Sequence, residues 1–213
     1  MAEDLKFYTN PMSRGRIVRW MLEETGQPYD THFLQYGEGM NSPDYLAINP
    51  MGKVPAIAHN GAVVTECAAI CTYLADVFPE AGLAPRPEEK AQFFRTMFFA
   101  AGPLEQAVTN RSMGWATDDP QKSGMMGYGS FERAVNGLKT LLGDGPYFCG
   151  DRFTAVDVYA GSQIGWGLQF GTLPTSAEFE AYRDRIYARD AYQRGSAKDD
   201  AAMAEYGPPG AAG

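Results

Sequence analysis

A proline- and glycine-rich segment, residues 79–87 (PEAGLAPRP), divides the chain into two parts of different character. Segments of this composition end regular structure, and domain boundaries fall in linkers of this kind. Before the segment, strand-like runs alternate with helical patterns, and after it every strong segment has the helical period. We therefore predict two domains, over residues 1–80 and 87–213.

The first part has the pattern of a mixed α/β domain. Apolar residues recur at helical spacing in two segments, and His59-Asn60-Gly61 is a hairpin signal between two apolar runs. The predicted order is strand, helix, strand, strand, strand, helix. These elements are expected at Leu5–Thr9, Arg14–Glu24, Tyr29–Leu34, Val54–Ala58, Ala62–Thr65 and Cys67–Val77.

The second part is expected to be entirely helical. Apolar stripes begin at Phe94 and Phe131, and two further helices are predicted over Thr154–Phe170 and Ser176–Arg189. The first stripe is read as a single helix that reaches Val108. Its aromatic residues are expected to lie mostly in the core. The tail from Gly195 is small and polar, and we expect it to be frayed. The aromatic residues of the first stripe that are expected in the core are Phe93, Phe94, Phe98 and Phe99.

Composition and charge exclude several classes of protein. The chain has 213 residues and a net charge of −8, which disfavours nucleic acid or anionic lipid as the main partner. It contains no run of about eighteen apolar residues, so a membrane span is not expected. The N-terminal sequence does not have the form of a signal peptide. With no export signal and three cysteines that cannot all pair, we expect a cytoplasmic protein.

The segment Asn10-Pro11-Met12-Ser13-Arg14 lies between a predicted strand and a predicted helix. Ser13 is a natural N-cap for that helix. The same geometry suits a functional role, since a helix N-terminus favours an anion and a hydroxyl there can lower the pKa of a thiol by donating to its thiolate. Tyr8, Thr9 and Asn10 are neighbouring donors that could take this role.

Lys53-Val54-Pro55 leads into a predicted strand, where a proline marks an edge or a special loop. A cis peptide bond between Val54 and Pro55 lets the Val54 backbone face outward and pair with a peptide-like ligand. The alternative is an ordinary connecting loop.

Thr65-Glu66-Cys67 begins a predicted helix. One interpretation is structural, with Thr65 as N-cap and Glu66 favourable in the first turn. In the functional one, Glu66 receives an ammonium group and the helix N-terminus receives a carboxylate.

Thr154 and Asp157 have the spacing of a capping box, so we assign them a structural role. Cys67 and Cys71 lie one helical turn apart and lack the ligand set of a structural zinc site. The sequence contains only two histidines, so neither a histidine-based metal site nor a catalytic triad is expected. No metal site is predicted.

Five segments taken in order resemble the cytosolic glutathione S-transferase family, over residues 4–194. The Pro-x-Ser-Arg pattern resembles a bacterial and fungal branch of that family. The segments are PMSRGRIVRWMLEETGQPY, SPDYLAINPMGKVPAI, TECAAICTYLAD, GDRFTAVDVY and RDAYQRG.

The resemblance implies a thioredoxin-like α/β N-terminal domain, an all-α C-terminal domain and a homodimer. It implies a cytoplasmic detoxification enzyme that uses glutathione as co-substrate, needs no other cofactor, and conjugates the glutathione thiolate to electrophilic, mostly apolar small molecules. Neither nucleic acid nor a membrane is an expected partner. Two alternatives stay open: a non-catalytic or regulatory protein of the same fold, and a glutathione-dependent thiol transferase or disulfide reductase.

The family's glutathione-binding positions correspond to Lys53, Val54, Pro55, Glu66 and Cys67 in this chain. Cys67 stands where the family usually has serine, and a thiol is the weaker hydrogen-bond donor. For activation of the thiol, Ser13 is our choice, with Tyr8, Thr9 and Asn10 as alternatives. The electrophile is expected to contact Met12, Arg111 and Trp115.

Overall fold

The computed structural model describes residues 4–117 and 119–207, and these form two compact units. The first unit holds the residues up to Gly82 together with those from Tyr187 onward, and the second holds Leu83–Ile186. The expected boundary near residue 80 is therefore present. The expected extent of the second domain, 87–213, differs from the structure at its C-terminal end, because the last helix packs within the first unit.

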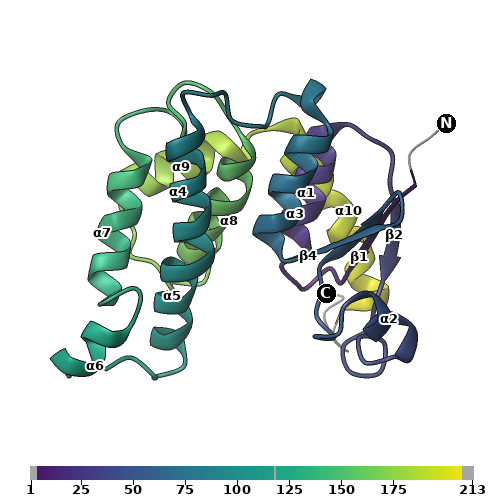
Figure 1. Cartoon of the computed structure of the whole chain (residues 1–213), viewed down its shortest axis with the longest axis horizontal. Helices are drawn as coiled ribbons and strands as arrows, with labels where there is room; N and C mark the ends of the chain where they lie inside the picture. The colour runs from purple at the N-terminus through teal and green to yellow at the C-terminus, as the bar shows by residue number, and fades with distance from the viewer. Residues whose placement is uncertain (1–3, 118, 208–213) are drawn as a thin grey trace. The chain divides into compact units, whose positions relative to one another are not determined.

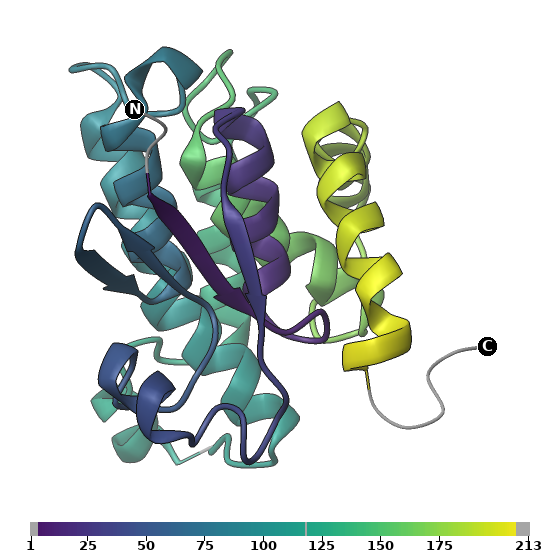
Figure 2. The same ribbon diagram turned by 90° about the vertical axis from the view of Figure 1, so that its right-hand side faces the viewer.

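The first unit is built on a four-stranded sheet in the order β2-β1-β3-β4. β1 runs parallel to β2 and antiparallel to β3, and β3 pairs with β4 in a hairpin. Helices α1 and α3 lie together on one face of the sheet (Figures 1 and 2). This is the thioredoxin-like arrangement that the resemblance implied. The elements are β1 (Leu5–Thr9), α1 (Gly15–Thr25), β2 (Asp30–Phe33), α2 (Pro43–Ile48), β3 (Ala56–His59), β4 (Ala62–Thr65), α3 (Cys67–Val77) and a 3₁₀ turn (Pro79–Ala81).

Helix α2 was not predicted, although it has clear local signals. The Ser42 hydroxyl accepts a hydrogen bond from the Tyr45 N–H, and Pro43 occupies the first helical turn. The helix buries Tyr45 against Met40 and Ala56, and Tyr8 packs on this cluster. Because side chains alternate along a strand, Tyr8 points away from the face that Phe7 presents to α1.

Helix α10 (Asp190–Tyr206) extends the first unit and lies alongside α1 (Figure 2). The expectation of a frayed tail from Gly195 was wrong for residues 195–206, which are helical, and its last part, 208–213, lies outside the described residues. The residues are small and polar, as the sequence indicated, but their charged side chains pair with α1. Lys198 pairs with Glu23, Asp199 with Arg19, and Asp200 with Arg16.

The second unit is all-helical, as predicted, with two local differences. The expected single helix from Phe94 to Val108 is interrupted by a π-helical turn that contains Pro103, a residue without an N–H for the regular ladder. Phe93 is fully buried, but Phe94 and Phe98 are 42% and 72% exposed, so this stripe is only partly core. The elements are α4 (Lys90–Phe99), the π turn (Ala100–Leu104), α5 (Glu105–Ser112), α6 (Pro120–Met125), α7 (Phe131–Leu142), α8 (Ala155–Gln169) and α9 (Ala177–Tyr187).

Helix α8 carries the predicted capping box at its N-terminus. Thr154 is the N-cap, and the Asp157 carboxylate accepts hydrogen bonds from the Thr154 and Phe148 N–H groups and from the Tyr182 hydroxyl. Asp157 thus joins three segments of the second unit. None of the described helices is long and apolar enough to cross a lipid bilayer.

Candidate functional site

The strand register brings three loops to the same end of the sheet. Tyr8, Ala56 and Thr65 lie in one row across β1, β3 and β4. The β1–α1 loop follows this row, Pro55 precedes it, and Glu66 comes directly after it. Neighbouring strands are about 4.8 Å apart, so the row spans about 10 Å from β1 to β4. A short peptide in an extended conformation can contact all three loops at once.

The β1–α1 loop is held together by Ser13. Its hydroxyl donates to the Asn10 carbonyl at 2.7 Å and accepts from the Gly15 N–H at 2.9 Å. Ser13 therefore satisfies the first N–H of α1, although Arg14 occupies the N-cap position itself. Gly15 permits this close turn, because a Cβ there would lie 1.9 Å from the Thr9 Oγ1.

The alternative donors in this loop differ in accessibility. Thr9 and Asn10 are fully buried, and the Asn10 side chain donates to the Leu34 carbonyl and accepts from the Met12 N–H. Tyr8 is partly buried, with its ring stacked on His32 at a centroid distance of 5.0 Å. Ser13 is also partly exposed. Accessibility thus favours Ser13 and Tyr8 over the two buried residues.

The Val54–Pro55 peptide bond is cis, as anticipated. The loop before it is anchored through the Lys53 carbonyl, which accepts from the Tyr45 hydroxyl at 2.6 Å and from the Asn49 amide at 2.8 Å. Burial raises the pKa of Tyr45 to about 12, so its hydroxyl remains a donor at neutral pH. The Lys53 side chain is exposed. Tyr45 and Asn49 are supporting residues that the sequence analysis missed.

The start of α3 has unusual backbone geometry. Glu66 has a φ of +68°, a left-handed value that is uncommon for a residue with a side chain. It occupies the N-cap position without a side-chain cap bond, so the structural interpretation with Thr65 as N-cap was wrong. The Glu66 side chain is exposed. The buried Cys67 thiol donates to the Arg14 carbonyl at 3.5 Å, which links this turn to the β1–α1 loop.

The residues predicted to contact an electrophile belong to different units. Met12 is 50% exposed in the first unit, and Trp115 is 64% exposed in the second. Arg111, also in the second unit, stacks on the Phe131 ring at 4.0 Å. Their joint use as a substrate site stays a prediction.

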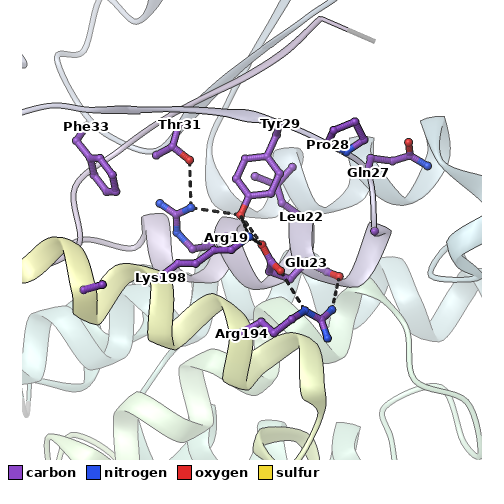
Figure 3. A pocket seen from close by; sticks show the side chains of 12 residues that line it. Arg19, Leu22, Glu23, Gln27, Pro28, Tyr29, Thr31, Phe33, Arg194 and Lys198 are labelled. Atoms are coloured by element: carbon purple, nitrogen blue, oxygen red, sulfur yellow. Dashed lines mark hydrogen bonds and ion pairs between the residues drawn. The ribbon is translucent and has the colours of Figure 1, made fainter. Parts of the chain in front are cut away.

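A cleft of about 830 Å³ lies elsewhere in the first unit, between α1, β2 and α10 (Figure 3). It contains none of the predicted glutathione-binding residues. Three of the polar side chains that line it converge on Glu23: Tyr29 and Lys198 both donate to its carboxylate, and Arg194 bonds to the same residue. Arg19, which also lines the cleft, pairs with Asp199. Burial raises the pKa of Glu23, but these hydrogen bonds outweigh it and leave the pKa below its ordinary value. The polar side chains of this cleft therefore connect α1 to α10 through ion pairs and hydrogen bonds.

No group of three or more metal-ligating His, Cys, Asp or Glu side chains occurs in the part of the chain that the structure describes. The three cysteines are free thiols. Burial raises the pKa of Cys149 to about 11 and that of Cys71 well above its ordinary value, which leaves both in the unreactive thiol form at neutral pH.

Comparison with known proteins agrees with this geometry. Residues 12–77 match the family model of the glutathione S-transferase N-terminal domain. Protein LigF of Sphingobium sp. is 44% identical over 69 residues, which cover 32% of this chain and 27% of LigF. Glutathione S-transferase GstA of Escherichia coli O157:H7 is 30% identical over 131 residues, 59% of this chain and 63% of GstA. The matched stretch thus spans less than two thirds of either relative.

Solved structures extend the similarity over nearly the whole chain. A glutathione transferase homologue from Sulfitobacter, determined with bound glutathione, superposes with a TM-score of 0.72 at 26% identity. The superposition covers 94% of this chain and 99% of that one. By the matched N-terminal domain, the curated relatives and this shared architecture, the chain is similar to glutathione S-transferases over nearly its whole length.

Proposed function

We propose that this protein is a glutathione transferase that conjugates glutathione to electrophilic, mostly apolar small molecules. The observation that carries the proposal is the meeting of three loops at one end of the sheet: residues 10–14, the Val54–Pro55 turn and the Glu66–Cys67 turn. Each offers a different kind of contact to a charged tripeptide. The homodimer and the contacts of the electrophile remain predictions.

Glutathione is assigned across this end of the sheet. The Val54 backbone N–H and C=O make no hydrogen bond with the described residues, so both are available to pair with the cysteinyl backbone. Glu66 offers an exposed carboxylate to the α-ammonium group. Lys53 offers an exposed ammonium to the glycine carboxylate at the other end. The opposite charges at the two ends of the ligand therefore find opposite charges on the protein.

Ser13 is assigned as the donor to the glutathione sulfur. Its hydroxyl proton is engaged with the Asn10 carbonyl, so donation to sulfur exchanges one hydrogen bond for another. A bond to a neutral acceptor contributes about 1 kcal/mol and one to a charged acceptor about 1.5–3 kcal/mol. The exchange therefore favours the thiolate by about 1 kcal/mol or slightly more, which lowers the thiol pKa by about one unit.

The reaction follows from this polarisation. The thiolate attacks an electrophilic carbon, a C–S bond forms, and the bond from that carbon to its leaving group breaks with the electron pair going to the leaving group. The thiol proton passes to solvent when the thiolate forms. Because residues 10–15 contain no cysteine, the loop offers no second thiol for disulfide exchange.

The test compares wild type with Ser13→Ala, and with Ser13→Thr as the variant that keeps the hydroxyl. Thiolate absorbance of bound glutathione gives the thiol pKa, and turnover of 1-chloro-2,4-dinitrobenzene gives the rate. We expect Ser13→Ala to raise the bound-thiol pKa by about one unit and to lower kcat/KM near neutral pH about tenfold. Ser13→Thr should restore most of both.

Three results would count against the proposal. An unchanged thiol pKa in Ser13→Ala removes Ser13 from the role and makes Tyr8 the next variant to measure. Absence of glutathione binding at millimolar concentration in calorimetry identifies a non-catalytic protein of this fold. Reduction of a mixed disulfide without conjugation identifies the thiol-transfer alternative.

A further inference from the structure

Asn10 connects the candidate thiol site to the end of the last helix. Its side-chain nitrogen donates to two main-chain carbonyls, that of Leu34 at 2.9 Å and that of Tyr206 at 3.3 Å. Its side-chain oxygen accepts from the Met12 N–H at 2.9 Å. Its own carbonyl receives the Ser13 hydroxyl at 2.7 Å. A fully buried residue thus ties the loop that holds Ser13 to Leu34, directly after β2, and to the last residue of α10.

The end of α10 has further contacts with this region. The last carbonyls of a helix have no partner within the helix, and here two of them accept from side chains of the first unit. The Gln35 amide donates to the Glu205 carbonyl at 3.2 Å, beside the bond from Asn10 to Tyr206. The Tyr206 ring also stacks on Phe33 at 4.6 Å between centroids.

A second connection runs from the body of α10 to the same loop. Arg16 donates to the Pro11 carbonyl at 2.6 Å and pairs with Asp200 at 2.7 Å. Helix α10 therefore holds the beginning of the loop twice, through Asp200 and Arg16 at the Pro11 carbonyl and through the Tyr206 carbonyl at the Asn10 amide.

We propose that the last turn of α10 supports the thiol site by anchoring the loop that carries Ser13, and that Asn10 is a positioning residue for Ser13. The inference rests on the proposed function. The Asn10 carbonyl accepts the Ser13 hydroxyl until its proton turns to the thiolate. The Asn10 side chain holds the main chain of the loop, and with it the Ser13 oxygen, in place by binding Leu34, Tyr206 and Met12. Without the amide bonds the loop gains conformational freedom, and the Ser13 hydroxyl spends less time where it can donate to the thiolate.

Two independent changes test this. Asn10→Asp keeps the acceptor for Met12 but places an oxygen against two carbonyls, which breaks both anchors. A chain ended after Ala204 removes the Glu205 and Tyr206 carbonyls and leaves Asn10 intact. Its matched control is a chain ended after Gly207, which keeps both carbonyls. Circular dichroism and glutathione calorimetry establish that each variant is folded and binds.

We expect Asn10→Asp and the chain ended after Ala204 to raise the bound-thiol pKa and to lower kcat up to about tenfold, the limit set by complete loss of the Ser13 bond. The KM for glutathione should stay close to wild type, because no glutathione contact is removed. Combining the shorter chain with Ser13→Ala should add little to Ser13→Ala alone. The chain ended after Gly207 should match wild type.

The proposal is overturned if the folded shorter chain keeps the wild-type thiol pKa and kcat, or if it changes only KM. Equal losses in both truncated chains would also overturn it. If wild type itself neither binds glutathione nor lowers its thiol pKa, the proposed function fails instead. If wild type does both and the Asn10 and α10 variants match it, the proposed function stands and only this inference fails.

Discussion

The ion pair between Arg19 of α1 and Asp199 of α10 offers the sharpest test of how the last helix is held. The Arg19 Nε lies 2.7 Å from an Asp199 carboxylate oxygen, and the two side chains are 2% and 1% exposed. The pair is incompletely satisfied, since the Arg19 Nη2 and the Asp199 Oδ2 have no hydrogen-bond partner among the described residues. The guanidinium also packs on the rings of Phe7 and Phe33.

Removing one partner leaves a buried charge without its counter-ion. We expect Asp199→Leu or Arg19→Met to lower the free energy of unfolding of the first unit by about 3–5 kcal/mol. The double variant removes both charges together with their desolvation cost and two unsatisfied polar atoms. It should therefore cost less than either single change, so that the double-mutant cycle gives a coupling energy of several kcal/mol.

Urea unfolding can be followed by the fluorescence of Trp20, which is 2% exposed and contacts Tyr192 of α10 at 5.1 Å between ring centroids. Trp115→Phe and Trp166→Phe in the background restrict the signal to the first unit. Asp200→Ala is the control, because its pair with Arg16 joins the same helices but Asp200 is 66% exposed. It should cost at most about 1 kcal/mol. A double variant as unstable as the sum of the two single variants would refute the reasoning.

Two further predictions concern other parts of the chain. Burial raises the pKa of Asp157 to about 6, above its ordinary 3.8, although hydrogen bonds from the Phe148 and Thr154 N–H groups lower it. A raised pKa means that the folded state binds the extra proton, so the stability of wild type relative to Asp157→Asn should fall as pH rises from about 4 to about 6. Urea midpoints measured across that range check this, and a constant difference between the two proteins contradicts it. Glu66→Gln should weaken glutathione binding by about 1 kcal/mol, roughly fivefold, as one exposed charged contact is lost. Calorimetry with Glu38→Gln as an exposed control measures it, and equal affinities of the two variants would remove Glu66 from the ammonium site.

The helix that these tests probe is the part of the fold that the sequence predicted worst. Residues after Gly195 have few apolar side chains, so local periodicity gave no reason to expect a packed helix. The stabilising partners of Arg194, Lys198 and Asp199 are Glu23 and Arg19, more than 170 positions away in the chain. A charge pattern shows that a segment is polar, but it does not show which distant charge will pair with it.

The strands and helices of the first unit were predictable because their signals are local in the sequence. Helix α3 was found at the predicted residues, Cys67–Val77, because its apolar residues recur at the helical period. The hairpin around Asn60 and Gly61 was found because both residues adopt positive φ there. The prediction for the second unit failed at Phe98, which has helical spacing but lies on an exposed side of α4. Spacing identifies a face of a helix, and the packing of other elements decides whether that face is buried.

The same distinction separates two classes of residue in the candidate site. Ser13, Pro55 and Glu66 lie in turns, and turns have local sequence signals. Asn10 and Asn49 support those turns by donating to main-chain carbonyls, those of Leu34 and Tyr206 in one case and of Lys53 in the other. A carbonyl is present whatever the side chain, so the partner position has no signature in the sequence. For these bonds, substitutions at Leu34 should be tolerated as long as its partial burial is kept. Replacement of Asn10 removes the side-chain donor to both of its carbonyls, whereas replacement of Asn49 leaves the Lys53 carbonyl with the Tyr45 hydroxyl.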